Sequence, residues 1–523
     1  MQEAINENKI LLPTKYIIFT VLISLPIRYH LGSFSESYLP AIALFLLIIV
    51  FSIFAYSSGN YRYIYYFFLW GAGIPSDIFR FLLLGIAVIF LALLCPKKIA
   101  YFGQDLLLLT KVFVILVAYL GLTSIAFVGY NSDLWSFLLY LITFLSYPIC
   151  AFLLLRIDLS DDDIFFMLKV LLTVIFSHLI SVLLYPLILG SINDYTSAVG
   201  SLMAFANSLG MSFPVDDYPW GDWHMSSLSS SNIVGLISSI FGVFCLFCAL
   251  FKEKVYYYLL MGLSFLIYIM TDTKHTYAIT IIGIYLLLWW VHLLINKWWV
   301  NLFLYIGAFV LFIIFSINMI NIWNSLDNIE RKYTEDVQNS KYELIQRSVK
   351  LIKEHPMAFL VGRSPGTYGS RIASSRAGDV IAKKEIKLPS FIPNRASSDY
   401  AWAMDGLYTE TILVQSKSGA MQNPFASMIG IVMEMGIIGG LLFFFILYSI
   451  FIFCNKFIKE TTSLIWKAYA ITVMFAILYM IWGSIFEQYF EVPAAAMFFW
   501  SFIAIFLLKY RNHKRAIEMY KNR

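Results

Sequence analysis

Residues 426–454 read ASMIGIVMEMGIIGGLLFFFILYSIFIFC, a stretch with a single charged side chain, Glu434. About 20 apolar residues are enough to cross the hydrocarbon core of a bilayer, and backbone hydrogen bonding there requires a helix. The whole chain shares this character, because 60% of its 523 residues are hydrophobic and only 13% are charged. Soluble domains carry roughly 25% charged residues. The sequence therefore predicts an all-α polytopic membrane protein.

Apolar runs with polar boundaries extend outward from this stretch and predict 14 transmembrane helices. The run at 61–75 is short and contains Gly71, Gly73 and Pro75, so 13 spans with a re-entrant or surface helix there is the alternative. The predicted spans are 16–33, 38–57, 61–75, 78–95, 105–127, 134–155, 164–190, 231–250, 255–271, 276–295, 300–320, 426–454, 464–485 and 493–508.

Basic residues in short loops predict the orientation, because they gather on the cytoplasmic side. They occur at 97–98, 252–254, 455–463 and in the tail after 508, and the alternation of spans puts all four on one side. Both termini are then expected in the cytoplasm. The topology divides the chain into N-terminal helices 1–190, an outer loop 191–230, central helices 231–320, an outer loop 321–424, C-terminal helices 425–508 and a cytoplasmic basic tail 509–523.

The two long outer loops have opposite charge. Between 341 and 395 there are eleven Lys or Arg and four Asp or Glu, a local charge of +7 that exceeds the +5 of the whole chain. The loop 191–230 has four Asp, one His and no Lys or Arg. Long loops are translocated regardless of charge, so the positive charge of 321–424 is free to serve a function. A basic and an acidic loop on one face can enclose an anionic substrate.

The basic loop is predicted to contain a short helix at 341–355. Asn339, Ser340 and Glu343 form a capping pattern, and Pro356 ends the helix. Arg347, Lys350 and Glu354 share one helix face, whereas Leu344, Ile345 and Ile352 are expected to pack inward. The guanidinium of Arg347 suits phosphate oxygens, although a solvated amphipathic helix would show the same pattern.

A glycine-rich turn follows, with Gly362, Gly366 and Gly369 among the arginines 363, 371 and 376. Glycines let backbone N–H groups approach an anion closely, which favours anion binding over a plain surface loop.

Polar residues at the outer ends of predicted spans are further candidates. Lys274 and His275 lie in a polar turn, where they either line a cavity or pair with Asp272. Glu434 lies inside a span beside Gly436, so it is either a functional carboxylate or a packing partner of a neighbouring helix. Arg80 either pairs with Asp77 or joins an anion site.

The acidic loop adds aromatic and titratable groups near 220. Trp223 can stack on a sugar or sit at the membrane interface. His224 beside Asp222 is a candidate general base with an orienting carboxylate.

The order and sidedness of these pieces resemble the O-antigen polymerase and O-antigen ligase superfamily of bacterial polysaccharide assembly. The resemblance covers roughly residues 229–445. It comprises Ser231-Asn232 with Gly235 opening a span, the basic turn 273–275, an outer loop with Arg347, His355-Pro356 and Gly362 to Gly366, and re-entry into the membrane through Asn423, Glu434, Gly436 and Gly439. Ligases of this superfamily have a His before that Asn, whereas this chain has Gln422, which favours a polymerase.

The resemblance implies a glycosyltransferase that joins undecaprenyl-pyrophosphate-linked repeat units at the outer face of the bacterial inner membrane, without a cofactor or required metal. A ligase-type transferase or a lipid-linked oligosaccharide flippase is the alternative. Expected partners are the lipid-linked oligosaccharide, the phospholipid bilayer, a chain-length regulator and a flippase, with no nucleic acid. The candidate acid or base is Glu434, His275 or Glu410, and the pyrophosphate and glycan are expected to contact Arg347, Arg363, Arg371, Lys274, Arg80, Asn423, Trp223 and His224.

Overall fold

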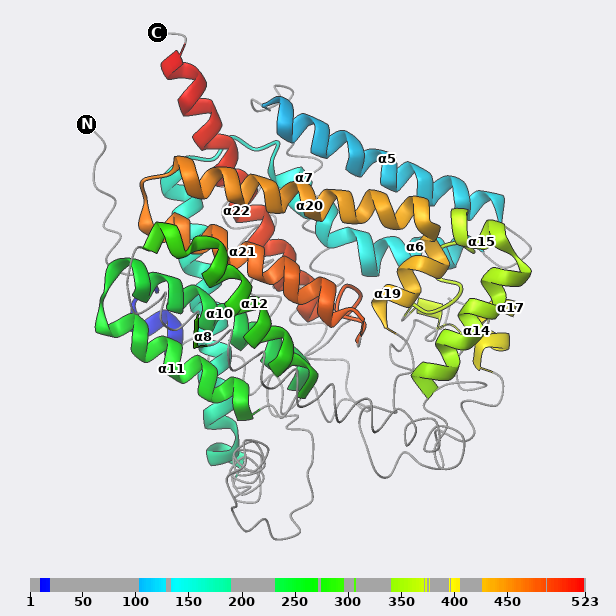
Figure 1. The fold of residues 1–523 in the computed structure, drawn as a ribbon, viewed down its shortest axis with the longest axis horizontal. Coiled ribbons are helices and arrows are strands. Elements are labelled where there is room, and N and C mark those ends of the chain that lie inside the picture. The colour runs from blue at the N-terminus through cyan, green and yellow to red at the C-terminus, as the bar shows by residue number, and fades with distance from the viewer. Residues whose placement is uncertain are drawn as a thin grey trace, which may run out of the picture.

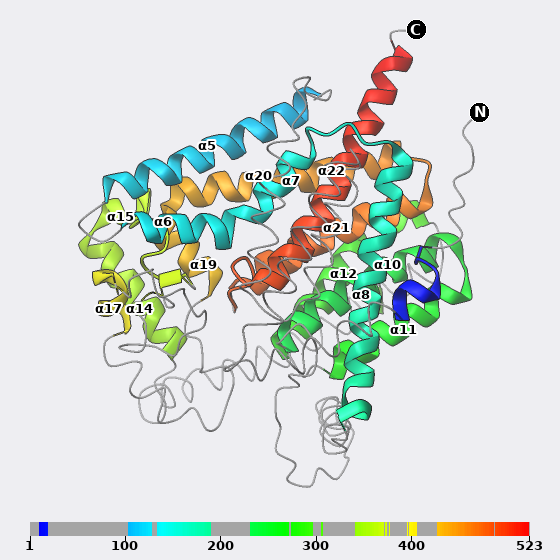
Figure 2. The same ribbon diagram turned by 180° about the vertical axis from the view of Figure 1, so that it is seen from behind.

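The computed structural model describes residues 10–18, 103–127, 133–189, 231–270, 274–295, 305–306, 340–370, 372–373, 376, 395, 397–404, 426–485 and 487–521. Within these ranges the secondary structure is helical and no strand occurs. Figure 1 shows the helices, and Figure 2 shows them from behind.

The apolar helices follow the predicted spans closely. The first group is α5 (Gln104–Ala126), a helix built of α6 (Leu134–Tyr140), the π segment η1 (Leu141–Leu145) and α7 (Ser146–Leu154), then α8 (Asp161–Leu189), α10 (Ser231–Lys252), α11 (Val255–Met270) and α12 (Lys274–Ile295). The second group is α19 (Ser427–Gly430), the π segment η4 (Ile431–Met435), α20 (Gly436–Glu460), α21 (Leu464–Gly483) and α22 (Pro493–Lys521). Three short helices lie between the groups: α14 (Ser340–Glu354), α15 (Pro356–Val361) and α17 (Ser398–Met404).

Seven helical stretches of the described chain are long and apolar enough to cross a membrane, which confirms a multi-pass membrane protein. Two shorter apolar helices, Val255–Ile269 and Thr276–His292, match two more predicted spans. The predicted spans 38–57, 61–75, 78–95 and 300–320 fall on or mostly on residues outside the described ranges, as does 16–33 beyond residue 18. The total of 14 spans stays a prediction.

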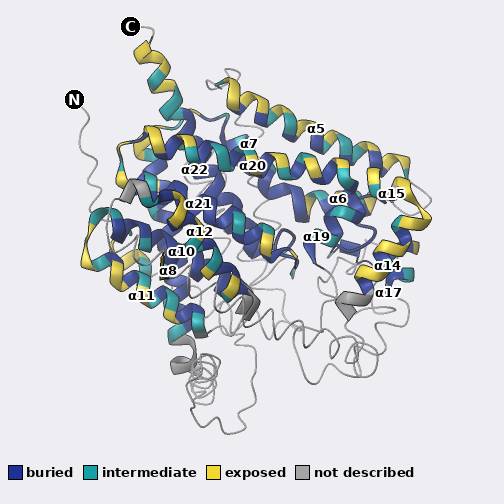
Figure 3. Ribbon diagram, viewed as in Figure 1, coloured by how far each residue is buried: buried dark blue, intermediate teal, exposed yellow. Residues whose placement is uncertain are grey.

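The core of the bundle lies around α21. This helix packs against α10, α12, α20 and α22, and most of its side chains are buried. By contrast, α5 packs on α20 at the periphery and leaves much of its surface exposed (Figure 3). Because both surfaces are apolar, burial in the core and contact with lipid impose the same composition.

At one end of the bundle, polar contacts join the basic tail to the turn between α7 and α8. Arg511 is 2% exposed and donates to the carbonyl oxygens of Leu155 at 2.8 Å and Ile157 at 2.7 Å. The Nζ of Lys509 lies 2.7 Å from Oδ2 of Asp161. Helix α22 continues without a break from the apolar span to Lys521, so the basic tail is an extension of the last helix.

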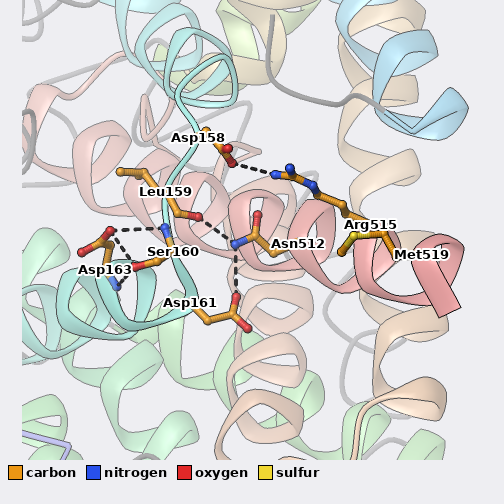
Figure 4. A pocket seen from close by; sticks show the side chains of 8 residues that line it. All are labelled: Asp158, Leu159, Ser160, Asp161, Asp163, Asn512, Arg515 and Met519. Atoms are coloured by element: carbon orange, nitrogen blue, oxygen red, sulfur yellow. Dashed lines mark hydrogen bonds and ion pairs between the residues drawn. The ribbon is translucent and has the colours of Figure 1, made fainter. Parts of the chain in front are cut away.

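A pocket of about 520 Å³ lies at this end, between the turn that precedes α8 and the last turns of α22. Figure 4 shows Asn512 bridging the carbonyl oxygen of Leu159 and Oδ1 of Asp161, with Arg515 on Asp158. Asn512 and Arg515 of the pocket lining therefore join the tail to the α7–α8 turn. The pocket is lined by Asp158, Leu159, Ser160, Asp161, Asp163, Asn512, Arg515 and Met519.

Candidate functional site

The described part of the basic loop folds into a unit that we call the cap: α14, α15, the glycine-rich turn 362–370 and α17. Figures 1 and 2 both show these helices beside α19, at the end of α5 and α20 farther from the C-terminus. The cap has a small apolar core of its own, which includes Met433 of the membrane helix. Its buried members are Leu344, Leu351, Tyr368, Ala373, Tyr400, Ala403 and Met433.

Helix α14 confirms the predicted short helix to within one residue at each end. Leu344 is buried and Ile352 packs against the cap core, as expected. The expectation for Ile345 was wrong, because its side chain is 47% exposed. Leu351 fills the inward position instead, since the buried stripe of α14 is rotated toward residues 344, 348 and 351.

Glu434 is the central residue of the site. Its carboxylate is fully buried, and Oε2 accepts the N–H of Gly366 at 2.7 Å. Oε1 accepts the N–H groups of Tyr368 at 2.8 Å, Gly369 at 3.0 Å and Ser370 at 3.0 Å. The glycine-rich turn thus does form an anion nest, and the anion in it is a carboxylate of the same chain. We call this arrangement the Glu434 clasp.

A break in the membrane helix presents Glu434 to the turn. The chain leaves the helical conformation at Gly436, where φ is 66°, and this frees carbonyl groups that a continuous helix would use. The backbone N–H of Arg363 donates to the carbonyl oxygen of Met433 at 2.8 Å. The hydroxyl of Tyr119 on α5 donates to the carbonyl oxygens of Met435 at 3.1 Å and Val361 at 2.7 Å. The freed groups are thereby satisfied, as burial at membrane depth requires.

Arg363 and Asp399 form a buried ion pair inside the cap. The Nε of Arg363 lies 2.6 Å from Oδ2 and its Nη2 lies 2.8 Å from Oδ1, which is the two-pronged geometry that suits guanidinium and carboxylate. Both residues are under 10% exposed. The pair joins the glycine-rich turn to α17, so the guanidinium of Arg363 is engaged inside the protein.

Arg376 joins the cap to the start of α6. Its Nη1 donates to Oδ1 of Asp133 and, at 2.6 Å, to Oγ of Ser136, and the residue is 2% exposed. Burial raises the pKa of Asp133, but the hydrogen bonds from Arg376 and the backbone of Ser136 outweigh it and hold that pKa below its ordinary value. Nη1 of Arg395 lies 3.7 Å from the other oxygen of Asp133.

Arg347 lies at the edge of the cap and is half-buried. Its Nη1 donates to the carbonyl oxygens of Trp402 at 3.3 Å and Ala403 at 3.1 Å. These carbonyls belong to the last turn of α17, where a cation is favourable. Beneath Arg347, Tyr368 donates to or accepts from Ser348 at 2.8 Å, and burial raises the pKa of Tyr368 to about 12.

The turn 484–492 between α21 and α22 completes the site, although sequence reasoning treated it only as a connection. The N–H of Ser427 donates to the carbonyl oxygen of Glu487 at 3.1 Å, and Nε2 of Gln488 donates to the carbonyl oxygen of Gly369 at 2.8 Å. Glu491 is 2% exposed and lies beside Gly430. Two acidic residues in a short turn between apolar runs, Glu487 and Glu491, are the sequence signal that could have identified this segment.

The N-terminus of α12 reaches the same end of the bundle. Lys274 and His275 form its first turn, and the description of these two residues covers their backbone only. The buried Thr276 bonds Tyr268 at 3.1 Å, and it lies beside Tyr479, whose ring meets that of Tyr489 with centroids 6.0 Å apart. Contacts thus continue from the start of α12 to the turn that holds Gly369.

Five of the predicted site positions lie within the described residues: Arg347, Arg363, Glu434, Lys274 and His275. Arg376, Asp399 and Asp133 join them, and the sequence did not single out the two acids. The remaining predicted positions lie outside the described residues: Arg80, Trp223, His224, Arg371, Glu410 and Asn423.

Among the described residues, no group of three or more His, Cys, Asp or Glu side chains is arranged to hold a metal ion. Comparisons with known proteins add no family assignment: no protein-family model matches the chain, and no curated protein matches it.

Proposed function

We propose that this protein is a polysaccharide polymerase, a glycosyltransferase that joins undecaprenyl-pyrophosphate-linked repeat units at the extracytoplasmic face of the bacterial cytoplasmic membrane. The observation that carries the proposal is the Glu434 clasp. It brings the Gly362–Gly366 turn of the outer loop against the Glu-x-Gly element of the membrane helix, with Arg347 in the same cap. These are the separate sequence pieces on which the resemblance to the polymerase superfamily rests.

The chemistry of the proposed reaction requires fixed positive charge at the membrane boundary. An acceptor hydroxyl attacks the anomeric carbon of the donor sugar, the bond to the lipid pyrophosphate breaks, and negative charge grows on the leaving pyrophosphate. Preorganised cations at that position are the largest catalytic contribution available. Arg347, in the cap that packs against the membrane helices, supplies such a cation without a cofactor or metal.

The contacts divide the arginines by role. Arg363 and Arg376 have buried carboxylate partners, and we assign them to positioning the cap. Arg347 is half-buried at the cap edge, and we assign it to the pyrophosphate, with Lys274, Arg371 and Arg80 as further predicted contacts.

Glu434 is assigned a positioning role as well. Both of its oxygens accept backbone N–H groups in a fully buried position, which leaves it poorly placed to take a proton from a substrate hydroxyl. The proposed acid or base is then His275 or Glu410, and Asn423, Trp223 and His224 stay predicted glycan contacts.

Reconstitution tests the proposal. The purified protein in liposomes is supplied with a lipid-pyrophosphate repeat unit, and the products are separated by size. A ladder of longer lipid-linked glycans is the expected result. Transfer only to a lipid A core acceptor would identify a ligase, and movement of the substrate across the bilayer without extension would identify a flippase; either outcome overturns the polymerase assignment.

Arg347→Ala provides the site-specific test. Loss of one stabilising group in such a site costs about 100-fold in rate, so the ladder should nearly disappear, while Arg347→Lys should retain part of the activity. Gln346→Ala is the matched control, because Gln346 is an exposed polar residue on the same helix and next to Arg347 in the chain. Full-length polymer from an Arg347→Ala variant that inserts normally would refute the role of Arg347.

A further inference from the structure

Helices α14 and α15 expose an apolar stripe that the cap core does not use. Ile345 and Val349 lie one turn apart on α14 and are 47% and 44% exposed. On α15, which packs against α14, Met357 and Leu360 are also exposed, at 66% and 46%. We call these four residues the α14–α15 face.

Polar residues border this face on one side. By the 3.6-residue period Lys353 lies next to Val349, whereas Lys350 lies further round the helix, where its Nζ is 4.0 Å from Oε1 of Glu354. The helix therefore carries three stripes around its axis: one buried in the cap, one apolar and exposed, and one polar and exposed. This arrangement is typical of helices that lie in a membrane interface.

The α14–α15 face continues the surface of the membrane helices. Helix α15 packs against α20, and the hydroxyl of Tyr119 on α5 holds its last residue, Val361. Near these contacts α5 exposes Leu122, at 67%, and α20 exposes Leu441, at 65%. Figure 3 shows exposed residues along α5, α15 and α14 at one edge of the molecule. Helices α5 and α20 belong to membrane-crossing stretches, so their exposed apolar side chains face lipid.

The direction of the face is set by the contacts beneath it. The Glu434 clasp fixes the turn that follows α15, and the ion pair of Arg363 with Asp399 fixes α17 against that turn. Ser348 bonds Tyr368 on the buried side of α14. With this side held, α14 cannot rotate to bury Ile345 and Val349 within the cap.

We infer that the α14–α15 face lies in the interfacial layer of the bilayer, with its apolar side chains at the boundary with the acyl chains and Lys353 among the phosphate groups. The partner is the phospholipid of that leaflet. A second protein copy is a poorer fit, because the exposed Lys353 borders the apolar stripe of α14 and because the face continues a lipid-facing surface. The inference concerns membrane contact alone and holds whether or not the protein is a polymerase.

Site-directed fluorescence tests this placement. Single cysteines at Ile345, Val349 and Met357 are labelled with bimane in the full chain, reconstituted in phosphatidylcholine vesicles containing some phosphatidylglycerol. Gln346→Cys is the matched control, since Gln346 is exposed on the polar side of the same helix. Cys150, Cys245, Cys248 and Cys454 are buried, and the unmodified protein measures labelling of native cysteines.

Each label is quenched by brominated acyl chains and, separately, by aqueous iodide. Interfacial helices sit about 5–10 Å into the headgroup and acyl boundary, so brominated lipid should reduce emission at 345, 349 and 357 more than at 346, and iodide should show the reverse order. If iodide quenches all four positions equally and brominated lipid none, the face is in water and the inference fails. Protection from both quenchers that grows with the protein-to-lipid ratio would show a second copy on the face, and would also overturn it.

A cysteine variant that does not elute like the unmodified protein is replaced by Leu360→Cys, which lies on the same face. Because Gln346→Cys lies on the same helix of the folded cap, the difference in quenching reports where each label lies relative to the bilayer. It does not depend on catalytic activity.

Discussion

Gly362 and Gly436 lie backbone against backbone where the cap meets the membrane helix. A Cβ on Gly436 would lie 2.4 Å from the backbone nitrogen of Gly362, and a Cβ on Gly362 would lie 2.3 Å from the carbonyl oxygen of Glu434. Both glycines also have positive φ, 87° and 66°. Neither position has space for a side chain, and both backbone conformations are unfavourable for other residues.

Gly436→Ala is therefore expected to loosen the cap. The backbone conformation at Gly436, with φ 66° and ψ −179°, is essentially restricted to glycine and alone costs about 1–3 kcal/mol in a residue with a Cβ, and the backbone clash adds to it. We expect a lower melting temperature in detergent and faster tryptic cleavage within 340–404. Gly262→Ala is the control, because no atom lies within 4 Å of a Cβ there. Equal behaviour of the two variants would contradict the close approach.

Glu434→Gln is predicted to open the clasp. The amide has one acceptor oxygen, and its NH2 group would face at least one backbone N–H that now donates to the carboxylate. An unsatisfied buried donor costs about 1–3 kcal/mol, so cleavage of the cap by trypsin should accelerate although the side chain keeps its size. An unchanged cleavage pattern would mean that the four N–H bonds do not hold the cap.

The Arg363–Asp399 pair is predicted to show strong coupling. Removing one partner of a buried ion pair costs about 3–5 kcal/mol, so Arg363→Met and Asp399→Leu should each destabilise the protein strongly, and the double variant should recover part of the loss. The exposed pair of Lys350 with Glu354, at 4.0 Å, provides a control cycle with almost no coupling. Thermal unfolding of the four proteins in each cycle gives the coupling energy.

The Asp133–Arg376 contact is predicted to weaken in acid. The pKa of Asp133 is lower in the folded protein than its ordinary value of about 4, so the pair stabilises the fold above that value and loses this contribution as the pH falls through the lowered pKa. The melting-temperature difference between the unmodified protein and Asp133→Asn should be constant near neutral pH and shrink in acid. If the melting-temperature difference did not change with pH, an ionised Asp133 could not be the source of the stabilisation.

Arg511→Ala tests the opposite end of the bundle. Its guanidinium satisfies the carbonyl groups of Leu155 and Ile157 in a buried position, so truncation should cost about 1–3 kcal/mol. Arg515→Ala removes a more exposed contact, with Asp158, and should cost under about 1 kcal/mol. Comparing melting temperatures of the two variants distinguishes the buried contact from the exposed one.

Much of the membrane fold was predictable because it depends on local properties. Apolar length alone predicts the helices α5, α10 and α21, since any segment in lipid must satisfy its backbone internally. The capping pattern at Ser340 and the break at Pro356 likewise located α14 to within one residue. These features depend on residues that are close together in the chain, so periodicity and composition are enough to predict them.

The site was less predictable, because its contacts join residues distant in the chain. The sequence indicated a glycine-rich anion nest at 362–370 and a carboxylate at Glu434, yet it predicted a substrate for the first and either catalysis or a contact with a neighbouring helix for the second. Only the tertiary structure showed that one holds the other. The ion pairs of Arg363 with Asp399 and of Arg376 with Asp133 were likewise visible only in the tertiary structure.

The sequence by itself determined that this chain is a multi-pass helical protein with an arginine-rich loop, because hydrophobicity and charge are properties of each segment. What only the tertiary structure decided is which of those charges are engaged within the protein. Glu434 lies in the π segment that ends at Gly436, and its carboxylate accepts the N–H of Gly366. The sequence periodicity of neither segment predicts that pairing. The pairing forms because the buried carboxylate of Glu434 and the non-helical backbone at Gly436 both require hydrogen-bond partners.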